Sequence, residues 1–222
     1  MMEGSSRFIL GFALLVVSSP VAFADRYEAT VTVRPVAGVG LFSENIAPGG
    51  GSSAASTYGG GGEVSMAYGL RNWLDVGAEA IAAAFTKATY DSATVAVHGI
   101  STMGRVTRTT RIAQLRAGAT LRLGVAWVPV VHLGFGLGAR MPTAATLRTD
   151  ENARVDLTPD GMDAGMSVDL CVIARAGLEH RLDRRWSIGV SAEVAHTVGL
   201  AGLSADLLSA GVSLSYTWYP LW

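Results

Sequence analysis

The sequence predicts an all-β chain that folds as an eight-stranded antiparallel up-and-down transmembrane β-barrel. Three observations support this: apolar and polar residues alternate along eight segments, short and long connections alternate, and tryptophans follow the short connections. Successive side chains of a strand point to opposite faces, so each segment has one apolar and one polar face. Only 16% of residues are charged, against about 25% in an ordinary soluble domain.

The first 24 residues have the features of a secretory signal peptide. Arg7 precedes the apolar run 8–17, and residues 22–24 form an A-x-A cleavage site. The run is too short to span a bilayer as a helix, which needs about 20 residues. We therefore predict a cleaved signal peptide at 1–24 and one barrel domain at 25–222; an uncleaved anchor is the alternative.

The predicted strands keep a regular parity. In the fifth, Leu133, Phe135 and Leu137 alternate with small or polar residues, and we expect the apolar face to meet lipid. Each segment reaches the roughly 9–11 residues that a tilted strand needs to cross a membrane. The third segment is the weakest, because Phe85 and two neighbours place apolar side chains on its polar face. The predicted ranges are 26–41, 62–71, 73–87, 110–124, 128–141, 165–182, 186–199 and 206–222.

Connections at 71–72, 124–126 and 183–185 are short. The others are mostly long, at 42–61, 88–109 and 142–164, with a short one near 200–205. Membrane barrels have short periplasmic turns, longer external loops and aromatic girdles at both interfaces. We therefore expect both termini in the periplasm and an aromatic belt at the rim formed by the short turns. The belt consists of Trp73, Trp127, Trp186, Trp218 and Trp222.

The last strand places Leu214, Tyr216, Trp218 and Trp222 on one face. It resembles the terminal strand of bacterial outer-membrane barrels, although Pro220 interrupts the pattern. The whole chain from residue 25 is similar to the small eight-stranded barrels of the OmpA, OmpX and OmpW type. This resemblance implies location in the bacterial cell outer membrane and contact with outer-membrane lipid and lipopolysaccharide. It also implies recognition of the C-terminal strand by the barrel-assembly machinery, and a monomer.

The polar faces carry charges of both signs, which such a barrel would enclose. An eight-stranded barrel is only wide enough for its own side chains or one small ligand, and an isolated buried charge is very costly. We therefore predict a lumenal charge network that sets strand register, with Asp75, Glu179 and Arg181 on the same faces. Gly134, Gly136 and Gly138 thin one wall and favour a cavity there. The predicted network comprises Arg34, Glu63, Glu79, Arg116, Arg122, Arg140, Asp169, Arg175 and Glu193.

The function that these features favour is a structural or interaction role with a charge-plugged lumen. A narrow passive channel for small solutes or ions, lined by the same groups, is the alternative. A secreted lipocalin-like barrel would need a polar exterior rich in lysine and glutamate, but Lys87 is the only lysine in the chain.

A lipid-modifying enzyme is the third alternative. His98, His132, His180 and His196 are scattered and lack an activating motif, so we predict no catalytic residues, and also no metal site and no cofactor. Cys171 is the only cysteine, which excludes an intramolecular disulfide. The net charge of −1 gives no electrostatic reason to expect nucleic-acid binding.

Overall fold

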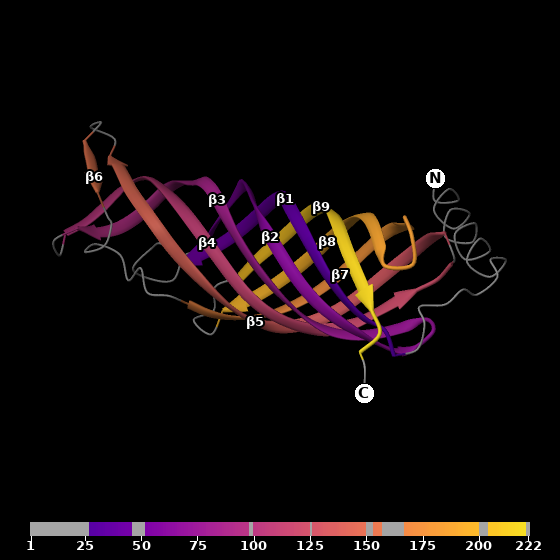
Figure 1. Ribbon diagram of the computed structural model, residues 1–222. Coiled ribbons are helices and arrows are strands. Elements are labelled where there is room, and N and C mark those ends of the chain that lie inside the picture. The colour runs from indigo at the N-terminus through magenta and orange to yellow at the C-terminus, as the bar shows by residue number, and fades with distance from the viewer. Residues whose placement is uncertain are drawn as a thin grey trace, which may run out of the picture.

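The computed structural model describes residues 27–45, 52–97, 100–124, 126–149, 153–156, 167–199 and 204–220. They form one antiparallel sheet of nine strands that closes into a barrel (Figure 1). Among these residues, no helix is long and apolar enough to cross a membrane. The strands are β1 (Ala29–Asn45), β2 (Ser52–Arg71), β3 (Leu74–Val97), β4 (Ile100–Arg122), β5 (Trp127–Thr149), β6 (Arg154–Asp156), β7 (Ser167–Arg181), β8 (Trp186–Gly199) and β9 (Ser204–Trp218).

The barrel closes between its first and last strands. Ala29 of β1 lies opposite Tyr68 of β2 on one side and Trp218 of β9 on the other. The ring runs β1-β2-β3-β4-β5-β7-β8-β9, and the short β6 is paired with β5 alone in the described part of the chain. The predicted eight-stranded antiparallel barrel is therefore confirmed, with β6 as an unpredicted addition. The predicted signal peptide at 1–24 lies outside the described residues.

The exterior of the barrel is apolar. Leu115, Leu133 and Phe135 are 71%, 62% and 69% exposed, while the residues between them along each strand are mostly buried or half-buried. The predicted orientation, with apolar side chains outward and polar ones inward, is confirmed by this alternation. A contiguous apolar surface formed by the outward side chains of neighbouring strands is not stable in water and marks contact with a membrane.

The strands differ strongly in length, and here the predicted boundaries were wrong. The ranges 42–61, 88–109 and 142–164 were predicted as external loops, but most of their described residues are strand. β3 and β4 have 24 and 23 residues, whereas β8 and β9 have 14 and 15. The register shifts between Phe85 and Ala88 and again between Tyr90 and Ala93. Each bulge reverses the parity of the following residues, so the two-residue period of the sequence is lost there.

Beyond the bulges, β3, β4 and β5 continue past the rest of the ring. We call residues 86–97, 100–109 and 141–149, together with β6, the outer extension; it lies at the end of the barrel away from the C-terminus (Figure 1). Its inner face has a hydrophobic core of its own, against which Val155 of β6 packs. The buried residues of this core are Ala55, Ala88, Tyr90, Val95, Val106, Ala145 and Leu147.

The opposite end of the barrel, which we call the turn end, has the short connections. Trp73, Trp127 and Trp186 are exposed there, and Trp218 lies half-buried near the end of β9. Trp222, the fifth predicted belt residue, lies outside the described residues. Other rings complete this rim: Trp127 lies 4.3 Å from His180, Trp186 lies 4.8 Å from Tyr216, and Tyr27 lies 6.5 Å from Tyr68, measured between ring centroids.

Candidate functional site

The middle of the lumen contains six charged side chains from six different strands. Strand pairing alone places them in three directly opposed pairs: Arg34 with Glu63, Glu79 with Arg116, and Arg175 with Glu193. All six have the inward parity of their strands, so closing the barrel points them at one another. We call this set the central network: Arg34, Glu63, Glu79, Arg116, Arg175 and Glu193.

Contacts across the barrel join the three pairs into one unit. Arg34 Nη2 lies 2.5 Å from Glu63 Oε2 and 2.6 Å from Glu193 Oε2. Arg175 Nη2 lies 2.7 Å from Glu63 Oε2, 3.0 Å from Glu79 Oε2 and 2.6 Å from Glu193 Oε2. Arg116 Nη1 lies 2.8 Å from Glu193 Oε1 and 3.2 Å from Glu79 Oε1. Glu193 therefore contacts all three guanidinium groups.

Neutral polar side chains complete the network. Arg116 donates from Nε and Nη2 to Gln114 Oε1 at 2.9 and 2.5 Å. Arg34 donates from Nη1 to Ser191 Oγ at 3.0 Å. Neither Gln114 nor Ser191 was among the predicted site residues, although both have the inward parity that identified the charged ones.

Burial makes charge balance essential in this region. The side chains of Arg34, Arg116 and Glu193 are only 1–2% exposed. Removing an ion from water costs several kcal/mol, which an ion pair offsets only when its geometry is good and its remaining polar atoms are satisfied. Three cations here meet three anions, so the central network is neutral as a unit.

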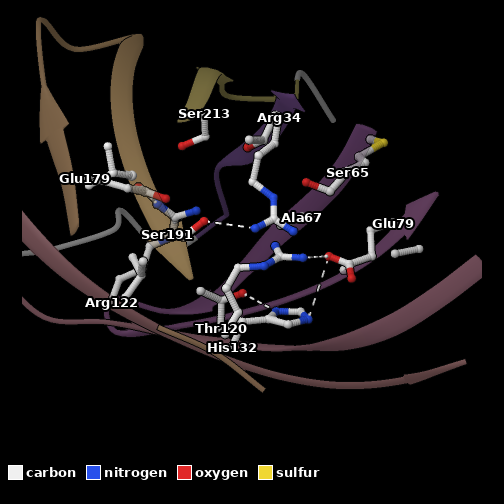
Figure 2. A pocket seen from close by; sticks show the side chains of 17 residues that line it. Arg34, Ser65, Ala67, Glu79, Thr120, Arg122, His132, Glu179, Ser191 and Ser213 are labelled. Atoms are coloured by element: carbon white, nitrogen blue, oxygen red, sulfur yellow. Dashed lines mark hydrogen bonds and ion pairs between the residues drawn. The ribbon is translucent and has the colours of Figure 1, made fainter. Parts of the chain in front are cut away.

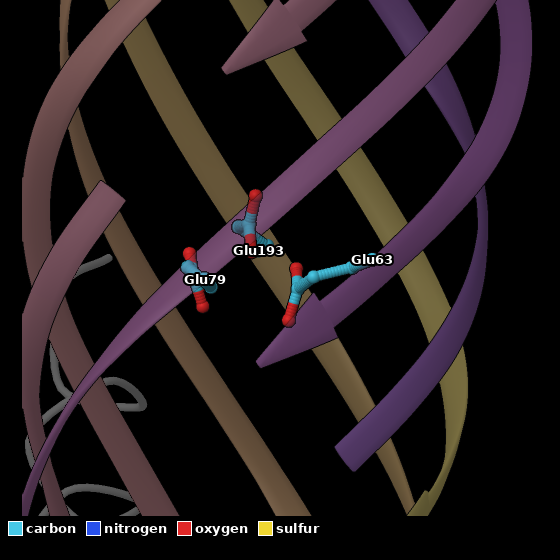
Figure 3. A group of neighbouring side chains, drawn as sticks. All are labelled: Glu63, Glu79 and Glu193. Carbon is cyan, nitrogen blue, oxygen red and sulfur yellow. The ribbon is translucent and has the colours of Figure 1, made fainter. Parts of the chain in front are cut away.

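The three glutamates were also assessed as a metal site. Oxygens of Glu63, Glu79 and Glu193 lie within 4.8 Å of one another (Figure 3). Each carboxylate already accepts from at least one arginine, and a divalent cation would have to displace those guanidinium groups. The donor set therefore fits arginine rather than a metal ion.

A second charged cluster lies nearer the turn end. Arg122 donates to Asp75 Oδ2 at 2.5 Å and makes a second ion pair with Glu179. A cavity of about 60 Å³ lies between this cluster and the central network, lined by Thr32, Ser65 and other polar residues (Figure 2). Another of about 30 Å³ lies on the turn side, and Arg122 and Glu179 line both. The Arg122 ion pairs therefore separate the inner cavity from the turn end.

His132 lies at the wall of the inner cavity. Its Nδ1 is 2.9 Å from Thr120 Oγ1, and its Nε2 is 3.9 Å from Glu79 Oε2 (Figure 2). This places a histidine beside the central network, where the predicted set had none.

On the outer side of the central network the lumen becomes apolar. Phe42 and Phe85 meet edge to face, with ring centroids 5.1 Å apart. Phe42 follows Arg34 along β1, and Phe85 follows Glu79 along β3, so both rings lie nearer the outer end than the central network does. The sequence signal for this layer was the apolar residues at inward positions. Of these, only Phe85 and its two neighbours in the third segment were noted, as irregularities of the alternation. The apolar layer consists of Phe42, Phe85, Ile112, Ile173, Ala195, Ala205 and Leu207.

Arg140 and Asp169 form a third charged cluster next to this layer. Arg140 donates from Nη2 and Nε to Asp169 Oδ2 at 2.9 and 3.1 Å, and Ser167 Oγ lies 3.1 Å from Asp169 Oδ1. The Arg140 guanidinium carbon is 5.8 Å from the centre of the Phe42 ring. The predicted single network is therefore three separate clusters. The apolar layer lies beside the cluster of Arg140 and Asp169. Arg181, expected on the lumenal face, is exposed at the turn end.

The glycines of β5 do not open a cavity, contrary to expectation. A Cβ at Gly138 would lie 2.7 Å from Gln114 Cγ, and one at Gly134 would lie 2.9 Å from His132 Nε2. The space that these glycines leave is therefore occupied by the Gln114 and His132 side chains. The inner cavity is lined instead by residues such as Thr32, Ser65 and Gly77.

The turn between β7 and β8 is held by one carboxylate. Asp183 Oδ1 accepts from the backbone N–H groups of Arg185 and Trp186 at 2.6 and 2.7 Å. These two hydrogen bonds stabilise the ionised form and lower the pKa of Asp183 below its ordinary value. The turn thereby orients Trp186 at the start of β8.

Known proteins with a similar arrangement of strands are found among solved structures. No protein-family model and no curated protein matches the chain. Among solved structures, the attachment invasion locus protein Ail of Yersinia pestis is 12% identical, covers 87% of this chain and 100% of its own, with a TM-score of 0.45. Neisserial surface protein A is 12% identical over 82% of this chain and 95% of its own, with a TM-score of 0.45. The outer-membrane protease OmpT of Escherichia coli is 8% identical over 90% and 99%, with a TM-score of 0.48.

These similarities concern the arrangement of strands and assign no activity to this chain. The membrane assignment follows from the chain itself: a closed ring of antiparallel strands, an apolar exterior and an aromatic rim. Closed barrels and helices are the structures that can span a bilayer, because every backbone polar group must be paired inside the protein. The chain is therefore a small barrel of the bacterial outer membrane.

Proposed function

We propose that this barrel has a structural or interaction role and that its lumen is closed by charge pairing. The observation that carries the proposal is the neutral central network, in which Glu193 contacts three arginines that come from three other strands. A network that joins six of the eight ring strands holds their register. It also leaves no continuous polar path, because the apolar layer lies on its outer side.

Planar-bilayer recording of the purified barrel tests the plug. The intact protein is expected to show no steady conductance. Glu193→Ala and Arg116→Ala are expected to lower stability and to produce conductance or leak. If both variants kept wild-type stability and remained silent, the proposed role of the network would be wrong.

Cys171 supplies an independent test, because it is buried in the lumen on the strand next to Glu193. Its side chain is 2% exposed, so a small polar thiol reagent is expected to label it slowly in the intact barrel. Labelling should accelerate in Glu193→Ala. Fast labelling of the wild-type protein would contradict a closed lumen.

A narrow passive conduit is the second candidate, and one observation favours it. The inner cavity of about 60 Å³ has charged and hydroxyl side chains among its lining residues and is separated from the turn end by the ion pairs of Arg122. Water or a small ion could enter from that side if Arg122 moved. Conductance of the wild-type barrel, abolished by a bulkier side chain at Ser65 or Thr32, would support the conduit over the plug.

We also propose that the chain has no catalytic role and works as a monomer. The described histidines are already engaged: His132 with Thr120, His180 with the Ala126 carbonyl, and His196 with Asp206. Lipase and protease assays on the folded barrel should give no turnover, and cross-linking in detergent should give a single-chain band. Turnover or a specific cross-linked oligomer would contradict these proposals.

Outer-membrane lipid, lipopolysaccharide and the barrel-assembly machinery are the partners that we propose. β9 supports the last of these, because its outward Leu208, Val212 and Leu214 form a continuous apolar face leading to Trp218. We expect Trp218→Ala to slow assembly of the heat-modifiable form in cells, whereas Trp127→Ala, at the same rim, should not.

A further inference from the structure

His132 has one ring nitrogen that the fold leaves unpaired. Its Nδ1 lies 2.9 Å from Thr120 Oγ1, but its Nε2 is buried and has no hydrogen-bond partner among the residues that the structure describes. The side chain is only 10% exposed, so bulk water does not supply that partner. A buried polar atom without a partner is costly and uncommon in native proteins. A new hydrogen bond at Nε2 would remove that cost.

The Nε2 atom faces a carboxylate oxygen that is already in use (Figure 2). Glu79 Oε2 lies 3.9 Å from His132 Nε2, which is too long for a hydrogen bond, and it accepts from Arg175 Nη2 at 3.0 Å. Moving the imidazole about 1 Å toward Glu79 would bring Nε2 within hydrogen-bond distance. Glu79 Oε2 therefore has two competing basic neighbours, of which Arg175 is bound and His132 is just out of reach.

The charge state of His132 matters because of the groups around it. His132 and Arg175 are directly opposite each other in the β5–β7 pair, and like charges in that arrangement are destabilising. The central network balances three cations with three carboxylates, so a protonated His132 would add a fourth cation to it. A neutral imidazole therefore fits the closed network better than a protonated one. The charged groups that face the ring or line its cavity are Arg34 of β1, Glu79 of β3, Arg116 and Arg122 of β4, Arg175 and Glu179 of β7, and Glu193 of β8.

We propose that His132 is a proton-binding site of the lumen, and that proton binding in mildly acidic medium loosens the central network. A protonated imidazole donates from both nitrogens. Nδ1 then donates to Thr120 Oγ1, and Nε2 donates to Glu79 Oε2 in place of Arg175. The imidazolium and the guanidinium of Arg175 also repel each other, because they are directly opposite. The inference rests on the proposed plug and names the condition that weakens it.

Displacement of Arg175 affects the whole network. Its Nη2 contacts all three glutamates of the network, Glu63, Glu79 and Glu193, which come from three other strands. Arg175 also lines the inner cavity, so its movement would extend that cavity into the network. Cys171 lies on the same strand, nearer the outer end, and is buried on the same inward face. Access of a reagent to the Cys171 thiol therefore reports the loosening of the network.

The test compares His132→Gln with His180→Gln, which removes a histidine at the turn end that is bonded to the Ala126 carbonyl. Glutamine keeps a polar side chain but takes up no proton in this pH range, and His132→Asn is a second variant of the same kind. Labelling of Cys171 by a small polar thiol reagent is measured on each purified barrel between about pH 8 and about pH 5, above the ordinary glutamate pKa of about 4.3. Folding is checked by gel mobility with and without boiling.

The quantity compared is the labelling rate of the wild type divided by that of His132→Gln at the same pH. Both proteins have the same thiol, so the pH dependence of the thiol itself cancels in this ratio. Urea titration of the folded and unfolded gel bands at the same pH values supplies a second measurement, which does not depend on the reagent.

We expect the ratio to be constant at high pH and to rise by up to about tenfold for each pH unit below about 6.5, because opening takes up one proton. The opened barrel binds a proton that the closed barrel lacks, so the urea midpoint of the wild type should fall as the pH falls. The midpoint of His132→Gln should fall less, and His180→Gln should behave like the wild type in both measurements.

A ratio that stays constant down to about pH 5, or loss of the response in His180→Gln as well, would overturn the assignment of the proton site to His132. Either result would leave the plug in place, because the wild type would still be closed at neutral pH. Fast labelling of the wild type at neutral pH would instead contradict the plug itself, so the two proposals fail in different ways.

Discussion

Arginine occupies two contrasting regions of this barrel. In the central network, Arg34 and Arg116 are almost completely buried, and the chain itself supplies their carboxylate partners. In the outer extension, Arg105, Arg148 and Arg154 are exposed and lie opposite one another. Buried charge must be neutralised inside the protein, so the lumenal arginines stabilise the fold. Exposed charge can be neutralised by the surroundings, so the outer arginines do not depend on buried carboxylates.

The largest expected effect is loss of the shared carboxylate in the lumen. Glu193→Gln keeps the size of the side chain but leaves three buried guanidinium groups with two carboxylates. Breaking a buried ion pair in this way costs about 3–5 kcal/mol. Urea titration of the folded and unfolded gel bands, in detergent, measures the change in unfolding free energy.

Asp206→Asn is the control for Glu193→Gln, because it also removes one carboxylate from a contact with a basic side chain, His196, but an exposed one. Its expected cost is below about 1 kcal/mol. A similar loss in both variants would mean that burial does not determine the cost of removing a carboxylate.

The next largest effect is expected in the apolar layer, on the outer side of the central network. Phe85→Ala removes one of the two rings that meet edge to face and leaves a cavity in the lumen. We expect a loss of about 3 kcal/mol in unfolding free energy. Phe135→Ala is the matched control, since this ring is 69% exposed to lipid, which can fill the space. Equal losses in the two variants would contradict a packed lumen.

Arg122→Ala is expected to have an intermediate effect. It leaves Asp75 and Glu179 without their shared cation, in a region only partly shielded from water, and costs about 1–3 kcal/mol. It also joins the inner cavity to the turn end. A thiol reagent added from that side should therefore label an engineered Ser65→Cys faster in the Arg122→Ala variant than in the protein that keeps Arg122. Unchanged labelling would show that Arg122 does not separate the two cavities.

In the outer extension, Arg105→Gln should have little effect on stability. The Arg105 side chain is 60% exposed, and its ion pair with Asp91 is worth less than about 1 kcal/mol. Urea titration should therefore match the wild type. A stability loss as large as that of Glu193→Gln would place Arg105 among the structural arginines instead.

The smallest expected effect is at the β7–β8 turn. The pKa of Asp183 is lowered in the folded state by two backbone N–H donors, so the ionised side chain stabilises the turn. This stabilisation is complete above the ordinary aspartate pKa of about 3.9 and is lost as the pH falls through the lower folded-state pKa. Asp183→Asn should remove this pH dependence, which unfolding titrations between neutral and acidic pH measure. An unchanged pH profile would assign the dependence to other carboxylates.

Much of the architecture could be predicted from alternation alone. β8 was predicted as 186–199 and is observed at those bounds, because an unbroken two-residue period identifies a strand with one face in lipid. Prediction failed in β3, where bulges near Ala88 and Ala93 shift the period. The predicted strand ends were also wrong at the outer membrane boundary, since strands that continue into water need not keep an apolar outward face.

The inward charges could likewise be identified as a set, because parity places Arg34, Glu79 and Arg175 on the lumenal face. Which of them meet could not be predicted. Glu193 and Arg34 are 159 positions apart and do not lie on adjacent strands, so their contact depends on how the closed ring points each side chain. For the same reason, the separate position of Arg140 with Asp169 was not visible in the sequence.

The sequence by itself therefore determined the eight strands of the ring, the antiparallel barrel and the side of each ring strand that faces lipid, since these depend on local periodicity. Only the tertiary structure decided which charges neutralise each other, where the lumen is filled by apolar side chains, and that Arg105, Arg148 and Arg154 form one row. The physical reason is that these features depend on register and closure, which join residues far apart in the chain.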